Sequence, residues 1–402
     1  MFESDDESLL EITRDEENLL SSIKQKIKNV PLSRCICRIP EEQLKGNVDK
    51  YHPQLVSIGP LHHSREDLRS TEDRKWLYLH ALLSRSTRKP TSMDARLKIC
   101  VNMIKESEHE ARKFYEGNNV KLNSHAFVEM LLVDGCFIIE LLLKYSAKEL
   151  RRGDDPFFTS MEMFLRLRSD VLLLENQVPF FVLHRLFKIV QIPNIKDHSH
   201  PSIVTLSIAF FKRIIQREVK NISSQHGEDF KHLLDLVHNY YLPTTPKFLS
   251  SSTGRQTILP TASTLHKKWI RFKQAESETL LDINFKKGVI KIPPLKILDH
   301  TELLFRNFIA FEHCHGDKAK PVTSYVLLLR SLIQSEDDIR LLYKSRILVN
   351  GLERQEQILD MLKKIIVEEE ETTMDMDFYY GGLREKIKEH LQTIKINRFM
   401  CF

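Results

Sequence analysis

The sequence predicts a mostly α-helical fold, in which a large helical body carries small β elements. Most of the 402 residues fall in segments whose apolar positions recur every three or four residues. Glycine and proline number only 12 and 15, so few turn-forming residues interrupt these segments. Two regions differ: 34–63 is rich in proline and β-branched residues, and 280–292 alternates with a period of two. The expected β structure is therefore N-terminal extended segments and a hairpin near 280–292.

The first 33 residues form an acidic, amphipathic segment. Eight acidic residues and one arginine occupy the first twenty positions, whereas a secretory signal needs a basic start and an apolar run. Apolar residues at helical spacing between 8 and 28 predict a helix. We expect this helix to dock on the body, and a partner-binding helix is the alternative.

The charge balance and the number of cysteines limit which partners and which cellular compartment can be expected. Lys and Arg number 60 against 55 for Asp and Glu, and the two kinds are interspersed, so no nucleic-acid partner is expected. Six cysteines are scattered at 35, 37, 100, 136, 314 and 401, which is too sparse for a disulfide framework. We therefore expect reduced thiols and a cytoplasmic or peripheral chain.

Three long helices are expected between 70 and 143. The first starts near Ser70, with Asp73 in a loose capping box, and its apolar stripe includes Trp76. The second covers 93–115. The third, 127–143, is apolar almost all round, so it should be a buried central helix. Its acids make it unsuitable as a membrane span, which needs roughly 20 apolar residues.

The acids of this central helix are candidate functional residues. Glu129 and Glu140 are eleven positions apart and so share one face, whereas Asp134 points elsewhere. A carboxylate in a core must be paired, hydrogen-bonded or protonated. We expect Arg or Lys partners that fix helix packing, and an active-site carboxylate is the alternative.

A second apolar helix is predicted over 161–190, and Pro179 should kink or split it. The polar block Glu175-Asn176-Gln177 precedes this proline. We expect the block to hydrogen-bond the carbonyls that the kink frees, and a ligand-contacting site is the alternative. A linker is predicted at 243–260. Further helices are expected at 202–220, 228–240, 260–277, 301–315, 320–334, 336–348 and 352–370.

The histidines near Gly59-Pro60 form the most conspicuous polar cluster. His62 and His63 are adjacent, and His52 and His80 could converge on them. A zinc site usually needs four ligands at set spacings, and neither HExxH nor paired CxxC is present. No phosphate loop, nucleophile elbow or dinucleotide fingerprint appears either. The sequence thus predicts no catalytic residues, no cofactor and no metal.

Seven motifs in a fixed order run from about residue 34 to 350. They occupy 38–63, 72–76, 134–140, 170–180, 281–285, 292–295 and 305–312. Together they identify the chain as similar to the plant domain of unknown function 247 family, also called uncharacterised protein family 0481. The motif residues, whose expected role is structural, are Tyr51, Pro53, Gly59, Pro60, His62, His63, Lys75, Trp76, Asp134, Gly135, Glu140, Glu175, Asn176, Gln177, Pro179, Asp282, Pro293, Arg306, Asn307 and Glu312.

The resemblance implies one helical body with small β elements, so 34–350 is the expected family core. Most members have a C-terminal transmembrane helix and are commonly found at the plasma membrane. Here 351–402 is instead predicted to be a helical tail without an apolar stretch long enough to span.

The family has no agreed activity, and some members are implicated as pollen-side determinants of self-incompatibility in grasses. The resemblance therefore implies a non-catalytic interaction, signalling or recognition protein whose partners are other proteins. The alternative is an enzyme that uses the buried carboxylates with His62 or His63.

Overall fold

A computed structural model of the chain describes residues 19, 35–85, 92–115, 120–190, 201–215, 230–242, 259–277, 279–315, 320–350, 355–365 and 378–399. These residues are mostly helical and form two small sheets, so the predicted fold class is confirmed. Except for Leu19, the helix expected at 8–28 lies outside the described residues, and so does 243–258 of the expected linker.

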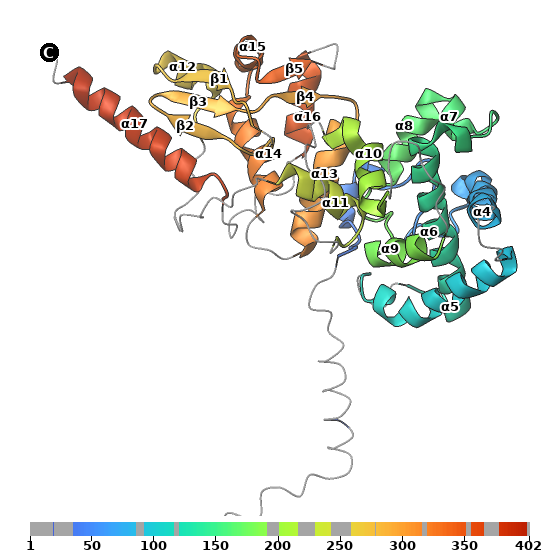
Figure 1. The fold of residues 1–402 in the computed structure, drawn as a ribbon. Coiled ribbons are helices and arrows are strands. Elements are labelled where there is room, and N and C mark those ends of the chain that lie inside the picture. Colours follow the sequence, from blue (N-terminus) through green and yellow to red (C-terminus); the bar gives the residue numbers. More distant parts are fainter. Residues whose placement is uncertain are drawn as a thin grey trace, which may run out of the picture.

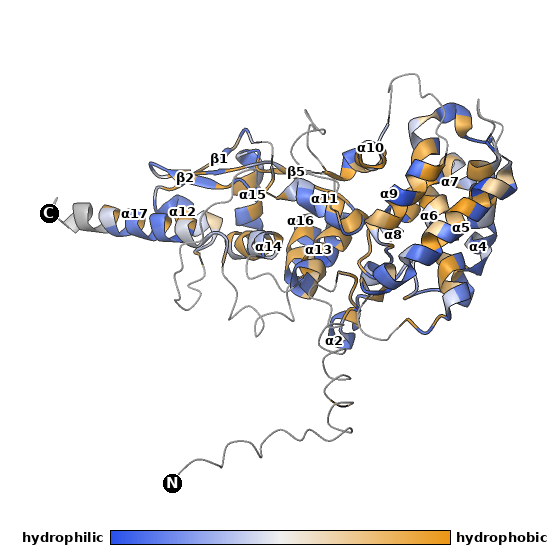
Figure 2. Ribbon diagram, turned by 60° about the horizontal axis from the view of Figure 1, so that its bottom comes forward, coloured by the Kyte–Doolittle hydropathy of each residue, from blue (hydrophilic) through white to orange (hydrophobic). Residues whose placement is uncertain are grey.

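Helix α6 (Ser124–Ser146) is the centre of the N-terminal half, as its apolar sequence predicts. Every residue from 130 to 144 is buried, and Figure 2 shows the apolar colour along the helix. The helix begins where the side chain of Asn123 accepts a hydrogen bond from the Ala126 N–H. The helices packed around it are α4 (Arg69–Ser84), α5 (Met93–Arg112), α9 (Phe180–Ile189) and α10 (Ile203–Ile215).

The segment 35–63, expected to be extended, is largely irregular. Its β structure is one isolated bridge between Ile36 and Tyr115. It also contains two four-residue helices, α2 (Glu41–Leu44) and α3 (Val48–Tyr51). The remaining short elements of this half are η1 (Glu66–Leu68), η3 (Lys148–Leu150), α7 (Pro156–Thr159) and α8 (Met161–Asp170).

The C-terminal half contains the remaining helices and both sheets (Figure 1). Helix α13 packs against α11, α14 and α16, and it also contacts α3 of the N-terminal segment. These helices match the apolar periods that predicted them. Their bounds are α11 (Leu233–Tyr241), α13 (Thr301–His315), α14 (Pro321–Leu332), α15 (Glu336–Lys344) and α16 (Gln355–Ile365).

The predicted hairpin is confirmed. Strands β2 (Asn284–Lys286) and β3 (Val289–Ile292) pair antiparallel around Lys287 and Gly288. These two residues have φ values of 49° and 71°, and a two-residue hairpin turn of type I′ requires positive φ at both positions. Phe285, Ile290 and Ile292 are buried on one face.

Three strands were not predicted. The helix expected at 260–277 ends early as α12 (Ala262–Lys267), and β1 (Arg271–Gln274) then pairs parallel with β3. Likewise, α15 ends at Lys344, and β5 (Leu348–Asn350) pairs parallel with β4 (Leu295–Ile297). These strands are three or four residues long, so an alternating pattern is too short to recognise.

The helix expected at 161–190 is split before Phe180, one of the two outcomes predicted from Pro179. Helices α8 and α9 are separated by the non-helical residues 171–179, and Pro179 is the N-cap of α9. Helix α4 begins at Arg69, close to the predicted start, but the predicted capping box is absent from it, and Trp76 is 47% exposed instead of lying in the core.

Helix α17 (Gly381–Phe399) contacts β2 and extends away from the body (Figure 1). Among the described helices, none combines the length and the apolar character needed to cross a bilayer.

Candidate functional site

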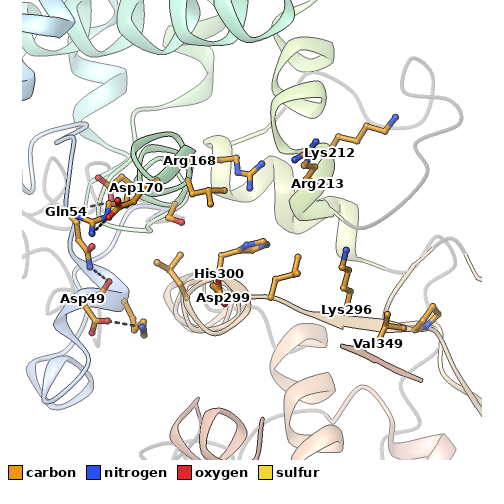
Figure 3. A pocket seen from close by; sticks show the side chains of 18 residues that line it. Asp49, Gln54, Arg168, Asp170, Lys212, Arg213, Lys296, Asp299, His300 and Val349 are labelled. Carbon is orange, nitrogen blue, oxygen red and sulfur yellow. Dashed lines mark hydrogen bonds and ion pairs between the residues drawn. The ribbon is translucent and has the colours of Figure 1, made fainter. Parts of the chain in front are cut away.

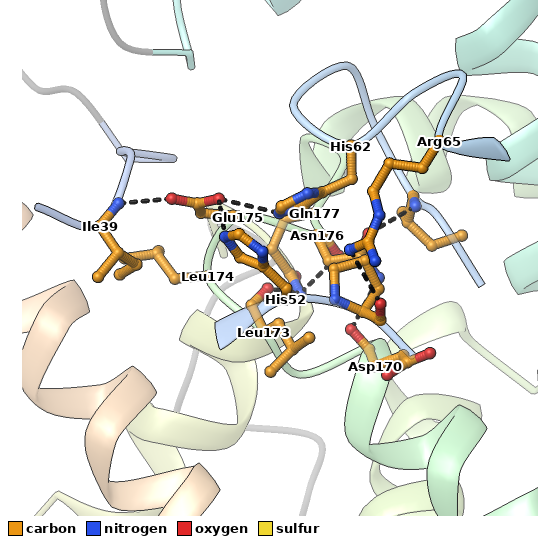
Figure 4. A network of polar contacts seen from close by, with 12 residues as sticks. Ile39, His52, His62, Arg65, Asp170, Leu173, Leu174, Glu175, Asn176 and Gln177 are labelled. Atoms are coloured by element: carbon orange, nitrogen blue, oxygen red, sulfur yellow. Dashed lines mark hydrogen bonds and ion pairs between the residues drawn. The ribbon is translucent and has the colours of Figure 1, made fainter. Parts of the chain in front are cut away.

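The connection between α8 and α9 is a network of buried polar side chains (Figure 4). Asn176 is fully buried, and its Oδ1 accepts a hydrogen bond from the Ile58 N–H at 2.7 Å. Its Nδ2 donates to the carbonyls of Val56 at 3.0 Å and Asp170 at 2.9 Å. The amide thus joins the connection to the segment 56–58, more than 100 residues away in the chain.

Gln177 and Asp170 complete this network. Gln177 Nε2 donates to the carbonyls of Val171 and Leu173, each at 2.9 Å; these acceptors belong to the non-helical connection rather than to a kinked helix. Asp170 accepts hydrogen bonds from three successive backbone N–H groups, those of Gln54, Leu55 and Val56. Burial nevertheless raises the pKa of Asp170 to about 6.

Two of the four candidate histidines meet Glu175, at one end of this network. His62 Nε2 lies 2.9 Å and His52 Nε2 lies 3.9 Å from Glu175 Oε2, and the two imidazole rings are 4.7 Å apart. The other carboxylate oxygen, Oε1, accepts the Ile39 N–H at 2.5 Å. Figure 4 shows both rings turned toward the carboxylate.

His63 and His80 do not join this cluster. His63 lies with Trp76 beside a separate hollow of about 300 Å³, and His80 is exposed on α4. The enzyme alternative drew on the buried carboxylates together with His62 or His63. The structure brings together only Glu175 and His62 of that set.

The pairing predicted for the acids of α6 is confirmed for two of the three. Asp134 receives Lys75 Nζ at 2.7 Å, and its other oxygen accepts the Gly59 N–H at 2.8 Å. Glu140 is paired with Arg85 at 2.6 Å. Glu129 is exposed, so the expectation that it shares the buried face of Glu140 is wrong.

The location of Glu129 explains that error. It lies near the N-terminal end of α6, beside the hollow that also contains His63 and Trp76. The turns of α6 around Glu140 are instead covered by neighbouring helices. Helical spacing places two residues on the same side of a helix but does not say how far the neighbouring helices extend.

The glycines of the motifs are required by close packing. Gly59 has φ +74°, and a Cβ there would collide with the Gln177 carbonyl oxygen. A Cβ on Gly135 would collide with a methyl group of Leu186 on α9. Both glycines therefore allow two segments to approach closely.

The motif residues of the second half also bind backbone groups. Asn307 Oδ1 accepts the Leu174 N–H, and its Nδ2 donates to the Lys50 carbonyl, each at 2.8 Å. Glu312 accepts hydrogen bonds from His238 and from the first turn of α14. Other contacts are those of Arg306 with Glu302 and the Lys364 carbonyl, of Asp282 with Ser277, and of the Pro53 carbonyl with Arg65.

The remaining motif residues are Tyr51, Pro60, Pro179 and Pro293. Tyr51 is buried at the end of α3, and Pro60 follows Gly59 in the loop that approaches Gln177. Pro179 and Pro293 end the connection before α9 and strand β3, respectively. These positions are consistent with the structural role that was predicted for them.

The cysteine expectation requires a correction. Cys37 and Cys314 form a disulfide with their Cα atoms 6.0 Å apart, which joins the N-terminal segment to the end of α13. They are 277 residues apart in sequence, so spacing gave no indication of the pair. Cys35, Cys100 and Cys136 are buried and do not take part in this disulfide. The expectation of reduced thiols throughout, which supported a cytoplasmic compartment, is therefore wrong for this pair.

A basic cleft of about 1160 Å³ was not predicted from the sequence. Its cations come from four places in the chain: Arg168 on α8, Lys212 and Arg213 on α10, Lys296 on β4, and Lys50 on α3. Figure 3 shows the guanidinium of Arg168 and the ring of His300 facing one space, with Arg213 and Lys296 around it. In the sequence, each of these cations is typical of an ordinary solvent-exposed surface. No sequence signal therefore indicates the cleft.

Comparisons with known proteins agree with the motif evidence. Residues 36–401 match the model of the family DUF247, described as plant protein of unknown function. The chain is 27% identical to UPF0481 protein At3g47200 of Arabidopsis thaliana over 383 residues, which cover 89% of this chain and 78% of the relative. It is 20% identical to Putative UPF0481 protein At3g02645 of the same plant, over 96% of this chain and 90% of that relative. No solved structure matches. The chain belongs to the plant domain of unknown function 247 family.

Proposed function

We propose that the protein is a non-enzymatic recognition protein, and that its basic cleft binds a phosphorylated or sulfated segment of a partner protein. The observation that supports this proposal is a buried arginine in the cleft that has no carboxylate partner in the described part of the chain.

Arg168 is only 4% exposed, yet it forms no hydrogen bond or ion pair with any described residue. Its guanidinium lies 5.5 Å from the centre of the Phe164 ring. Burial lowers the pKa of Arg168, and the nearby Arg213 lowers it further. A cation that lines a cleft without a carboxylate partner among the described residues is available to a bound anion. Such a group is expected where it serves a ligand, because local rules are broken mainly at functional sites.

The other polar groups of the cleft favour an anion as that ligand. His300 Nε2 is buried without a hydrogen-bond partner, and burial lowers the pKa of His300 to about 4, so the neutral ring is free to donate its proton. Most acids of the cleft are already engaged. The engaged groups are Asp49 with Lys50, Glu162 with Arg166, and Asp170 with the backbone N–H groups of 54–56.

The geometry favours a tetrahedral oxyanion ester. Arg168, Arg213 and Lys296 approach the same space from different elements (Figure 3), and a phosphate or sulfate ester offers acceptor oxygens in several directions. Apolar residues also line the cleft and provide contacts for the chain that carries the ester. They are Leu165, Pro294, Leu298, Leu303 and Val349.

A polypeptide is favoured over a nucleic acid as the carrier. Single-stranded nucleic acids bind through bases stacked on aromatic rings. Among the described residues that line the cleft there is no Phe, Tyr or Trp. The compartment follows from the ester: a phosphopeptide ligand means the cytoplasm, and a sulfopeptide ligand means the secretory pathway.

Fluorescence anisotropy tests the proposal. The probe is a labelled neutral peptide with one phosphoserine, compared with sulfotyrosine, unmodified and Ser→Glu versions, inorganic phosphate, and oligouridine. We expect an ester-bearing peptide to bind and the unmodified peptide not to bind. Arg168→Met should weaken binding by about 10- to 100-fold, since a charge-assisted hydrogen bond contributes about 1.5–3 kcal/mol.

Arg340→Met is the matched control, because Arg340 is exposed on α15 and paired with Glu336 outside the cleft. This variant should bind like the parent protein. Tighter binding of oligouridine than of every peptide would contradict the proposal, as would equal effects of the two substitutions.

The enzyme alternative has less support. Asp134 and Glu140 each contact a cation, and Asp170 is surrounded by backbone donors. Carboxylates held in this way serve packing better than proton transfer. Glu175 is the exception, and its contacts lead to a separate inference.

A further inference from the structure

We infer that His52, His62 and Glu175 form a binding site for one zinc-class divalent metal ion. This inference is independent of the proposed function, because none of the three residues lines the basic cleft.

The ligand atoms are close enough to share an ion. His62 Nε2 and His52 Nε2 lie 2.9 and 3.9 Å from Glu175 Oε2. One possible ligand atom from each of the three residues lies within 4.8 Å of those of the other two. Zinc binds imidazole nitrogen and carboxylate oxygen at about 2.0–2.2 Å, so tetrahedral ligands lie about 3.3 Å apart. A small movement of His52 would bring the set to this spacing.

The contact between His62 and Glu175 does not account for the cluster by itself. His62 is buried and lies beside the carboxylate, but its Nε2 has no hydrogen-bond partner of acceptable geometry among the described residues. A buried polar nitrogen left unpaired costs about 1–3 kcal/mol. A metal ion between the two side chains would bind the lone pair of His62 Nε2. This contact does not require Nε2 to point at Glu175 Oε2, as a hydrogen bond would.

The surroundings hold the ligands in place. Glu175 Oε1 is held by the Ile39 N–H, which leaves Oε2 for an ion. The adjacent Asn176 fixes the connection through its three hydrogen bonds. Outer hydrogen bonds of this kind orient metal ligands and raise affinity.

The site also has an open side. Glu175 and His62 are 2% and 6% exposed, whereas the side chain of His52 is 28% exposed. Solvent therefore reaches part of the His52 ring. Two imidazoles, one carboxylate and an open position match the ligand set of catalytic rather than structural zinc sites, and imidazole ligands suit zinc among divalent metals.

Cobalt substitution tests the inference on the full chain. The metal-free protein is titrated with Co²⁺, whose visible absorption reports coordination by protein ligands, and then with Zn²⁺ by calorimetry. We expect one ion per chain. His52→Ala should weaken Zn²⁺ binding by more than about 100-fold, because removing a ligand should exceed the 10- to 100-fold effect of losing an outer partner.

His63→Ala is the matched control, since His63 is the neighbouring histidine but faces a different hollow. It should leave the stoichiometry and the absorption band unchanged. Circular dichroism confirms that each variant is folded, and Glu175→Gln provides a second ligand variant. Absence of a cobalt band in the folded parent protein would overturn the inference. An equal loss of Zn²⁺ affinity in His52→Ala and His63→Ala would overturn it as well.

Discussion

Three buried polar side chains hold together segments that are more than 100 residues apart in the chain. Asp170, Glu175 and Asn176 all accept backbone N–H groups from the region 39–58. That region is mostly irregular, so its backbone groups depend on side chains for hydrogen bonds. These residues therefore take over the role that helix and sheet hydrogen bonds have elsewhere in the fold.

Asn176→Asp should destabilise the protein strongly. The substitution replaces Nδ2, which donates to two carbonyls, by an oxygen that faces the same two carbonyls. We expect a loss of about 3 kcal/mol or more in the free energy of unfolding, measured by urea denaturation. Asn102→Asp, on the exposed face of α5, should change it by less than about 0.5 kcal/mol. Similar losses in the two variants would contradict this account.

His232 should make stability depend on pH. Its Nδ1 accepts the Asp235 N–H and its Nε2 meets the Cys35 carbonyl, so the ring is neutral, and burial lowers the pKa of His232 from 6.5 to about 4. Between pH 6.5 and 4 the unfolded chain therefore binds a proton that the folded chain does not.

As the pH falls from 6.5 toward 4, the free energy of unfolding decreases by about 1 kcal/mol per pH unit. Above pH 6.5 the histidine is neutral in both states, so no stability is lost there. His232→Asn keeps a residue suited to the N-cap of α11 and removes the titrating ring. Denaturation between pH 7 and 4.5 should give a shallower slope for this variant. Parallel curves for variant and parent protein would show that His232 does not contribute.

At the scale of elements, sequence periodicity predicts the long segments well and the connections poorly. The central helix, the helices at 301–315 and 320–334, and the hairpin follow from apolar spacing and a turn signal. The connection 171–179 does not, because Val171–Leu174 continues the apolar pattern of α8. The backbone groups of this connection form hydrogen bonds with side chains instead: the Leu173 carbonyl with Gln177, and the Leu174 N–H with Asn307. Asn307 is 133 residues away from Leu174 in the chain, so the sequence near the connection does not reveal it.

Gly59→Ala tests the close approach of this connection to the loop before α4. The alanine would be strained at φ +74° and would also collide with the Gln177 carbonyl oxygen. We expect a loss of about 3 kcal/mol or more. Gly46→Ala is the control, because Gly46 has φ +73° but open space around the position of a Cβ. The free energy of unfolding of this variant should fall by only about 1 kcal/mol. Equal losses in thermal denaturation would show that backbone conformation alone matters.

The candidate sites could be predicted only in part. The sequence singled out His52, His62 and Glu175 as polar residues but gave no reason to join them, because they belong to different segments. Arg168 gave no signal at all, since a lone arginine in a helix normally reaches solvent. Its burial depends on elements that come from both halves of the chain.

At the scale of the whole molecule, the basic cleft lies between the N-terminal half, which contributes α8 and α10, and the C-terminal half, which contributes β4 and the start of α13. The two halves are also joined by Asn307 and by the Cys37–Cys314 disulfide. A bound anion would neutralise Arg168, which has no carboxylate partner among the residues that the structure describes, and would connect the halves further. The central claim is therefore that this arginine is kept for a ligand rather than for the fold.

The most direct test compares the unfolding free energy of Arg168→Met with that of the parent protein, with and without inorganic phosphate. Without phosphate, the variant should be at least as stable, because it removes a buried charge that has no carboxylate partner within the described ranges. Phosphate at 100 times its Kd should stabilise the parent protein by about 3 kcal/mol and leave the variant unchanged. A destabilised variant that phosphate still stabilises would contradict the account.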